Sequence, residues 1–212
     1  MTDLRKDPFN LIIAGVGGQG NILASQVVAQ AALMEDLNAT IGETYGVSQR
    51  GGSVMSHVRV TAGTPVGPLI PQGQADLLVG FEPIETLQVA MDFGNPQIRV
   101  ILNPRPVYPI GVLSGDLAYP PIDRVLDLLQ QHVADLKTLP ATEIAREAGE
   151  IRAMNLVMVG ALAATGLLPM KKESYLEAIQ DQFRGRTLEI NQRAFNSDLN
   201  VRLDFSMRNN RT

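Results

Sequence analysis

The sequence has 212 residues, of which 45% are hydrophobic and 19% are charged, and its formal net charge is −4 at pH 7. These values fit one globular domain with a sizeable core, and they supply no basic field for nucleic acid or an acidic membrane surface. Because the chain has no cysteine, it excludes disulfides, thiolate zinc sites and iron–sulfur clusters held by its own thiolates. With only two histidines as well, we expect no metal site in this chain.

The first ten residues, MTDLRKDPFN, lack the apolar run of a signal peptide. The longest apolar stretch, residues 154–168, is shorter than the roughly 20 residues that span a bilayer, and Asn155 and Thr165 interrupt it. We therefore expect a cytoplasmic protein without membrane insertion, in which this stretch is a buried helix.

The first half of the chain alternates apolar runs typical of strands with helical patterns. In chain order we predict a strand at 11–14, a helix at 20–35, a strand at 39–43, a loop at 44–52, an alternating strand at 53–60 and a turn region at 63–73. A strand at 76–81 leads into a helix opened by Glu82 and Pro83, and another strand follows at 99–102. Residues 106–115 are predicted to form a hairpin or an edge excursion.

The second half is mainly helical. We predict a helix at 122–132, a strand at 134–139 and helices at 142–148, 152–168, 171–183 and 187–196, with Pro169 ending the helix at 152–168. This order predicts the α/β class: a three-layer Rossmann-like domain with a mostly parallel, mixed sheet, helices on both faces and a helical C-terminal part. Residues 1–198 are assigned to that domain, and residues 199–212 to a C-terminal tail.

A glycine-rich motif, Gly15-Val16-Gly17-Gly18-Gln19-Gly20, lies between the first predicted strand and helix. Glycines let a backbone approach a phosphate closely, and a helix N-terminus offers N–H donors with a partial positive charge. Glu43 falls where a dinucleotide site places its ribose-binding acid, so an NAD or FAD site is one interpretation. The alternative is a sharp turn that serves packing or meets the backbone of a partner.

A second glycine-rich segment, Ser48-Gln49-Arg50-Gly51-Gly52-Ser53, precedes the alternating strand. Arg50 suits a bidentate contact with a carboxylate or phosphate, although a salt bridge to Glu43 or another local acid is at least as strong an alternative. His57 shares a strand face with Arg59, and a lone strand histidine is more often structural than catalytic.

Both segments together carry a resemblance to a known family. IIAGVGGQGNILASQVVAQAAL, followed by GETYGVSQRGGSVMSHVRV, resembles the gamma-type domain of pyruvate/2-oxoacid:ferredoxin oxidoreductases, and within it the small (beta) subunit of the indolepyruvate enzymes. The resemblance continues through ADLLVGFEPIETLQ and NLVMVGALAATGLLP to about Asp198. It is specific because GVGGQG and SQRGGSVMSHVR occur together at this spacing.

The resemblance implies a subunit of an enzyme that oxidatively decarboxylates a 2-oxoacid, generally with coenzyme A, and passes electrons to ferredoxin or another acceptor. Thiamine diphosphate and 4Fe-4S clusters are then expected on a large alpha subunit, in a hetero-oligomer such as a dimer of heterodimers. The resemblance implies no catalytic residue in this chain and no bound NAD. It implies binding roles for a set of residues in the two glycine-rich segments: Gly15, Gly17, Gly18, Gln19, Gly20, Ser48, Gln49, Arg50, Gly51, Gly52 and Ser53.

Three functions therefore remain open: an accessory subunit that shapes an active site, a free-standing NAD- or FAD-dependent enzyme, and a purely structural assembly module. From Arg184 onward the chain has six arginines, no lysine and three acids. The tail is either solvated or an arm that binds an acidic surface of the large subunit.

Overall fold

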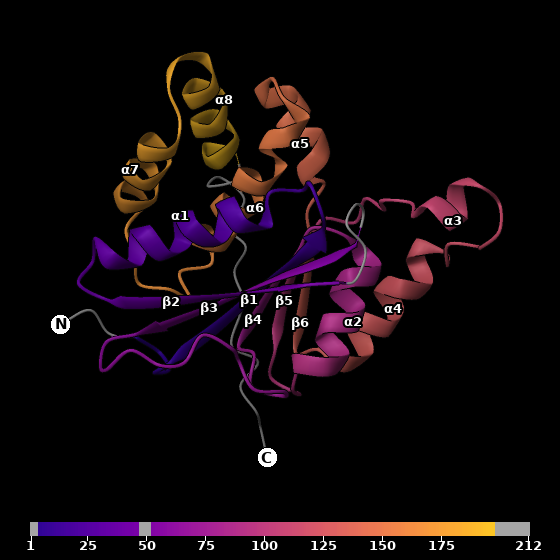
Figure 1. Ribbon diagram of the computed structural model, residues 1–212, viewed down its shortest axis with the longest axis horizontal. Helices are drawn as coiled ribbons and strands as arrows, with labels where there is room; N and C mark the ends of the chain where they lie inside the picture. The colour runs from indigo at the N-terminus through magenta and orange to yellow at the C-terminus, as the bar shows by residue number, and fades with distance from the viewer. Residues whose placement is uncertain (1–3, 47–51, 198–212) are drawn as a thin grey trace.

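A six-stranded sheet runs through residues 4–46 and 52–197, the part of the chain that the computed structural model describes (Figure 1). The strand order is β2-β3-β1-β4-β5-β6. β3 is antiparallel to both its neighbours, whereas β1, β4, β5 and β6 run parallel to one another, so the predicted mixed, mostly parallel sheet is confirmed. The strands are β1 (Phe9–Val16), β2 (Asn38–Tyr45), β3 (Ser53–Thr61), β4 (Leu77–Gly80), β5 (Arg99–Leu102) and β6 (Asp135–Thr138).

Helices cover both faces of this sheet, as predicted, with α2 and α4 on one face and α1, α5, α6, α7 and α8 over the other (Figure 1). None of the helices in the described ranges is both long and apolar enough to cross a membrane. The helices are α1 (Asn21–Leu33), α2 (Pro83–Phe93), α3 (Ile110–Leu113), α4 (Ile122–His132), α5 (Ala141–Ala148), the 3-10 turn η1 (Ile151–Ala153), α6 (Met154–Ala164), α7 (Lys172–Gln182) and α8 (Gly185–Asn196).

The position of β1 inside the sheet explains why its sequence is apolar without alternation. Successive side chains point to opposite faces of a strand, so Leu11 and Ile13 join the core under α1 and α6, while Ile12 and Ala14 join the core under α2 and α4. All eight residues of the strand are buried. A strand covered on both faces therefore reads as a continuous apolar run.

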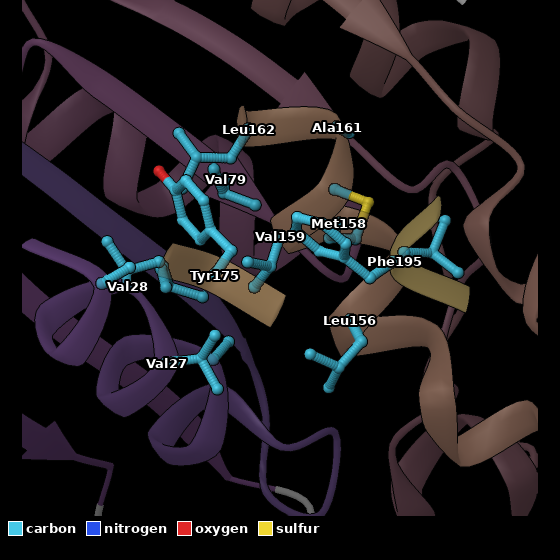
Figure 2. Close-up of a cluster of buried hydrophobic side chains, with 14 of the residues drawn as sticks. Val27, Val28, Val79, Leu156, Met158, Val159, Ala161, Leu162, Tyr175 and Phe195 are labelled. Atoms are coloured by element: carbon cyan, nitrogen blue, oxygen red, sulfur yellow. The ribbon is translucent and has the colours of Figure 1, made fainter. Parts of the chain in front are cut away.

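Helix α6 forms the centre of the larger core. Its residues from Met154 to Leu162 are all buried, and Figure 2 shows several of them packed with Val27, Tyr175 and Phe195. A Cβ atom on Gly160 would lie 2.2 Å from the Phe195 carbonyl oxygen, so this glycine permits close packing of α6 against α8.

Three expectations are corrected by the structure. Of the two alternatives for residues 106–115, the hairpin is wrong: the segment contains no strand and leaves the sheet as an excursion that carries the short helix α3. The helix predicted to reach residue 168 ends at Ala164, since Gly166 adopts a left-handed conformation (φ 59°) before Pro169 is reached. Residues Thr44 and Tyr45, expected in a loop, extend β2 because they pair with β3.

Candidate functional site at the glycine-rich edge of the sheet

The glycine-rich turn between β1 and α1 is held in shape by the side chain of Gln19. Its Oε1 atom accepts a hydrogen bond from the Val16 N–H (2.7 Å), and its Nε2 atom donates to the Phe81 carbonyl (3.1 Å). A Cβ atom on Gly15 would lie 2.6 Å from Gln19 Oε1, so glycine leaves room for this side chain. Both ends of the Gln19 amide thus bind backbone groups, and the residue ties the turn to the end of β4.

Two glycines of the same turn adopt left-handed conformations, with φ 98° at Gly18 and 84° at Gly20. At Gly20 an added Cβ atom would lie 2.4 Å from Nδ2 of Asn155, the atom that donates to the Gly20 carbonyl at 3.2 Å. At Gly18 an added Cβ atom would meet nothing within 4 Å. Gly20 is therefore needed for packing against α6, whereas Gly18 forms the open point of the turn.

The second glycine-rich segment meets this turn where β3 begins. The Gly17 N–H donates to the Gly52 carbonyl at 2.9 Å, and Val16 lies opposite Ser53 in the β1–β3 ladder. The first residue of α1, Asn21, donates from its side-chain amide to the backbone of β3 at 3.2 Å.

We call the resulting surface the glycine edge; in the described residues it comprises Gly15, Gly17, Gly18, Gln19, Gly20, Gly52 and Ser53. The fold thus brings together two segments that the sequence separates by about thirty positions. The other predicted binding residues, Ser48, Gln49, Arg50 and Gly51, lie outside the residues that the structure describes.

A cavity of about 440 Å³ adjoins the glycine edge on the α1 side, between the turn, η1 and α8. Helix α1 has no side-chain cap at Gly20 and no acidic residue in its first turn, so its N-terminal N–H groups keep their donor capacity. Arg152 also lines the cavity and is paired with Glu150 at 3.2 Å, which lowers the pKa of that carboxyl. The N–H groups of α1 are suited to an anionic group, whereas Glu150 also lines the cavity and balances the charge of Arg152.

Two glutamates lie on the other side of the glycine edge, in the first turn of α2. Glu82 is buried and caps the helix, because its Oε2 atom accepts the Glu85 N–H at 2.9 Å; its Oε1 atom accepts the Tyr119 hydroxyl. Burial is the largest cause that raises the pKa of Glu85; the neighbouring Glu82 raises it further, while a hydrogen bond with Ser53 opposes the shift. Glu82 and Glu85 are not part of a metal site, because no group of three or more His, Cys, Asp or Glu residues in residues 4–46 and 52–197 could hold a metal ion.

Glu43, the expected ribose-binding acid, is occupied elsewhere. Its two carboxylate oxygens accept hydrogen bonds from the hydroxyls of Ser25 (3.1 Å) and Ser56 (2.7 Å). Its strand, β2, is separated from β1 by β3, whereas in a dinucleotide-binding sheet the second strand lies directly beside the first. Glu43 therefore lends no support to a nicotinamide or flavin site.

His57 lies in the core on the α2 face of the sheet. Its Nδ1 atom accepts the Ile70 N–H at 3.3 Å, and its ring meets Phe93 edge to face at 5.3 Å. Burial, with a smaller contribution from the charge of Arg59, lowers its pKa, so the ring is held in its neutral form. Arg59 donates to Asn10 and to loop carbonyls, which makes both residues structural.

Three residues that support the site are not among those that the sequence predicts. Asn21 and Asn155 fix the turn, and Glu85 contributes a second acid beside it. Two signals could have indicated them: an asparagine directly after GVGGQG, and a carboxylate on each side of Pro83, three positions apart, after a buried strand. No such signal indicates Asn155, because only the packing of α6 brings this residue to the turn.

Solved structures define the class to which this fold belongs. The gamma subunit of a keto/oxoacid ferredoxin oxidoreductase from Geobacter sulfurreducens matches with a TM-score of 0.66 at 22% identity, covering 92% of this chain and 98% of that one. A 2-oxoglutarate:ferredoxin oxidoreductase from Magnetococcus marinus matches with a TM-score of 0.71 at 21% identity, over 93% of this chain and 31% of that one. The fold is thus that of a gamma-type domain of the 2-oxoacid oxidoreductases.

Sequence comparison gives the family itself. The model of the pyruvate ferredoxin/flavodoxin oxidoreductase family matches residues 10–199, and the chain belongs to this family. Indolepyruvate oxidoreductase subunit IorB of Methanothermobacter thermautotrophicus is 37% identical over 88% of this chain and 94% of its own length. The subunit of the same name from Archaeoglobus fulgidus is 38% identical over 91% of this chain and 94% of its own.

Proposed function

We propose that the chain is the small subunit of an indolepyruvate-type 2-oxoacid oxidoreductase. The complex oxidatively decarboxylates an arylpyruvate, generally to its acyl-CoA, and reduces ferredoxin or a similar acceptor in the cytoplasm. A large alpha subunit carries thiamine diphosphate, which stabilises the carbanion left by decarboxylation, and 4Fe-4S clusters, which accept the electrons. The expected assembly is a dimer of such heterodimers.

One observation carries the proposal: relatives named indolepyruvate oxidoreductase subunit match at 37–38% identity over nearly their whole length. The composition agrees with the division of labour, because a chain without cysteine has no thiolates with which to hold an iron–sulfur cluster. Within the described residues, the geometry supports a chain that adds a shaped surface to an active site, since the 440 Å³ cavity beside the glycine edge can receive a group from another molecule.

In this complex the glycine edge contributes backbone donors to the wall of the active site. The turn at Gly18 leaves the backbone approachable, and the N-terminus of α1 attracts negative charge. Arg50 adds a fixed positive charge for a phosphate of coenzyme A or a carboxylate, with Ser48, Gln49 and Ser53 as hydrogen-bonding support. Gln19 has the positioning role of holding the turn in shape.

The substitution Arg50→Ala in the assembled complex tests this role. Loss of a charge-assisted contact should raise the KM for coenzyme A or for the 2-oxoacid at least about tenfold, or lower kcat, because such a contact contributes roughly 1.5–3 kcal/mol. Arg124→Ala, on the exposed side of α4, is the matched control and should leave the kinetics unchanged. Gel filtration should show an intact complex in both variants.

Other outcomes point to the competing functions. An Arg50→Ala complex with wild-type kinetics would favour a structural assembly module. Flavin absorbance in the purified chain, or binding of NAD(P)H by the chain alone, would favour a free-standing dinucleotide-dependent enzyme. Full 2-oxoacid oxidation by either chain without the other would contradict the subunit proposal itself.

A further inference from the structure

The segment between β5 and α4, residues 104–120, carries α3 away from the body of the protein (Figure 1). We call it the 104–120 arm. Ile110 is 85% exposed and Leu113 is 71% exposed. Five of the eleven exposed large apolar residues in the described ranges lie on this one segment: Val107, Tyr108, Ile110, Leu113 and Leu117. Such a concentration of apolar surface marks an interaction site more often than chance exposure.

The arm is fixed to the body at both of its ends by Glu82. The Tyr119 hydroxyl and, at 3.4 Å, the Val107 N–H both donate to Oε1 of this buried carboxylate. The rings of Tyr108 and Tyr119 also meet edge to face, with centroids 5.2 Å apart. These contacts hold the arm in one position, which lowers the entropy that a binding partner must overcome.

A cavity of about 400 Å³ lies between the arm and the first turn of α2. Val16, which lies between Gly15 and Gly17 of the glycine edge, lines it, so the arm and the candidate site are continuous. Glu85 lines it too, and its Oε2 atom is buried without a hydrogen-bond partner in the described part of the chain. An acceptor left open in this way is costly in the isolated chain and is satisfied when a donor enters the cavity.

We propose that the 104–120 arm and its cavity form the docking surface for the large subunit. Apolar side chains of that subunit cover Ile110, Leu113 and Leu117, and one of its lysine or arginine side chains enters the cavity and binds Glu85. This inference rests on the proposed function, because it requires a larger partner that also reaches the glycine edge. A partner bound at Val16 would cover the adjoining arm.

The charges of the surface favour a different chain over a second copy of this one. In a two-fold symmetric contact, the same patch must supply both halves of every pair. The arm offers one basic residue, Arg105, which is already paired with Glu143 at 3.1 Å. Two copies would therefore bring their Glu82 and Glu85 pairs together without compensating charge.

The experiment uses the two co-expressed subunits and measures their dissociation constant by sedimentation, independently of activity. The double substitution I110D/L113D should raise the Kd at least about 30-fold, the loss typical of central interface residues. The matched control is L33D/M91D, because Leu33 and Met91 are 58% and 56% exposed and lie near the far ends of α1 and α2. It should leave the Kd unchanged, and thermal melts should show that both variants fold.

Glu85→Gln independently tests the proposed contact between the cavity and a basic side chain of the large subunit. Replacing the carboxylate that receives the basic side chain should raise the Kd about tenfold, whereas Glu177→Gln on the exposed face of α7 should not. Wild-type Kd values for both I110D/L113D and Glu85→Gln would overturn the proposal. So would self-association of the chain alone that I110D/L113D abolishes while the complex survives. If the wild-type pair assembles but oxidises no 2-oxoacid, the proposed function is wrong, and the Kd measurements still test the docking surface.

Discussion

The hydroxyl of Tyr175 is a polar group enclosed by apolar side chains (Figure 2). It has no hydrogen-bond partner in the described residues, and burial raises its pKa. The ring fills the space between α1 and α8, where it lies 5.7 Å from the ring of Phe195. The ring therefore stabilises the folded state by packing, whereas burial of the hydroxyl costs desolvation free energy that no hydrogen bond offsets.

Tyr175→Phe should raise the free energy of unfolding by about 1 kcal/mol, because it removes an unsatisfied buried hydroxyl and keeps the ring. Urea denaturation of the two proteins measures the difference. Tyr119→Phe is the contrasting control: it removes a hydroxyl that donates to Glu82 and should destabilise the protein. A destabilised Tyr175→Phe variant would show that the hydroxyl has a partner, such as a buried water.

His57 makes the stability of the protein depend on pH. Its pKa is lowered in the folded state, mainly by burial, so below pH 6.5 the unfolded chain binds a proton that the folded chain rejects. This contribution to stability is present above pH 6.5 and is lost as the pH falls below that value. The free energy of unfolding should therefore fall as the pH is lowered from 7 to 5.

The substitution His57→Asn should flatten this pH dependence, since an asparagine can accept the Ile70 N–H without titrating. Unfolding by urea at several pH values between 5 and 7 provides the measurement. His132→Asn on the exposed end of α4 should retain the wild-type slope. An unchanged slope in His57→Asn would assign the pH dependence to other groups.

At the scale of elements, the close packing of α6 on α8 depends on one glycine. Gly160 has no left-handed strain; the constraint is steric, because its missing Cβ atom would overlap the backbone of Phe195. A backbone atom cannot rotate away as a flexible side chain can, so α8 would have to move.

Gly160→Ala should therefore lower the free energy of unfolding by about 3 kcal/mol, at the upper end of the usual cost of overpacking. Gly67→Ala is the matched control, since its added Cβ atom meets nothing within 4 Å and its φ is not left-handed. Differential scanning calorimetry should show a clear loss for the first variant and almost none for the second. Equal melting temperatures would mean that the two helices can separate without cost.

The elements that were predicted well are those whose own sequence determines them. Helix α4 begins and ends where its apolar spacing predicts, at Ile122 and His132, and the buried strands at residues 76–81 and 99–102 were found from short apolar runs. Helix α1 was located correctly, but its apolar Ile22 is 40% exposed while polar Ser25 is buried against Glu43. The buried face of that helix follows from tertiary partners that a periodic pattern does not reveal.

The 104–120 arm was beyond the reach of local patterns for a similar reason. Its prolines and apolar residues suit a hairpin as well as an excursion. The contact between Tyr119 and Glu82, 37 positions apart, decides the outcome. A residue in the first turn of α2 thus sets the position of a segment that follows β5.

At the scale of the whole molecule, the order of the strands decides which residues can form a site. Insertion of β3 between β1 and β2 brings Gly52 and Ser53 to the glycine turn and moves Glu43 away from it. The same sequence motif, GVGGQG, would fit a dinucleotide site in a sheet of another order. Topology therefore removes from the turn the acid that a dinucleotide interpretation of the motif requires.

The C-terminal tail belongs to this scale as well, because its predicted role lies in the assembly; residues 199–212 fall outside the described residues. If the tail is an arm that binds an acidic surface of the large subunit, deletion of residues 199–212 should reduce co-purification of the two chains. The loss should grow with salt, as expected for contacts between charged groups. Arg124→Ala is a control for the loss of a single exposed charge, and undiminished assembly of the truncated chain would leave the tail as a solvated end.

The sequence by itself determined the fold class, most helices and strands, and the inability of this chain to hold a thiolate-ligated cluster. Each of these follows from composition or from local patterns of a few neighbouring residues. Only the tertiary structure decided that the two glycine segments meet, that Gln19 ties the turn to β4, and that Glu85 lies beside them with an open oxygen. These are contacts between residues far apart in the chain, and the register and order of the strands create them.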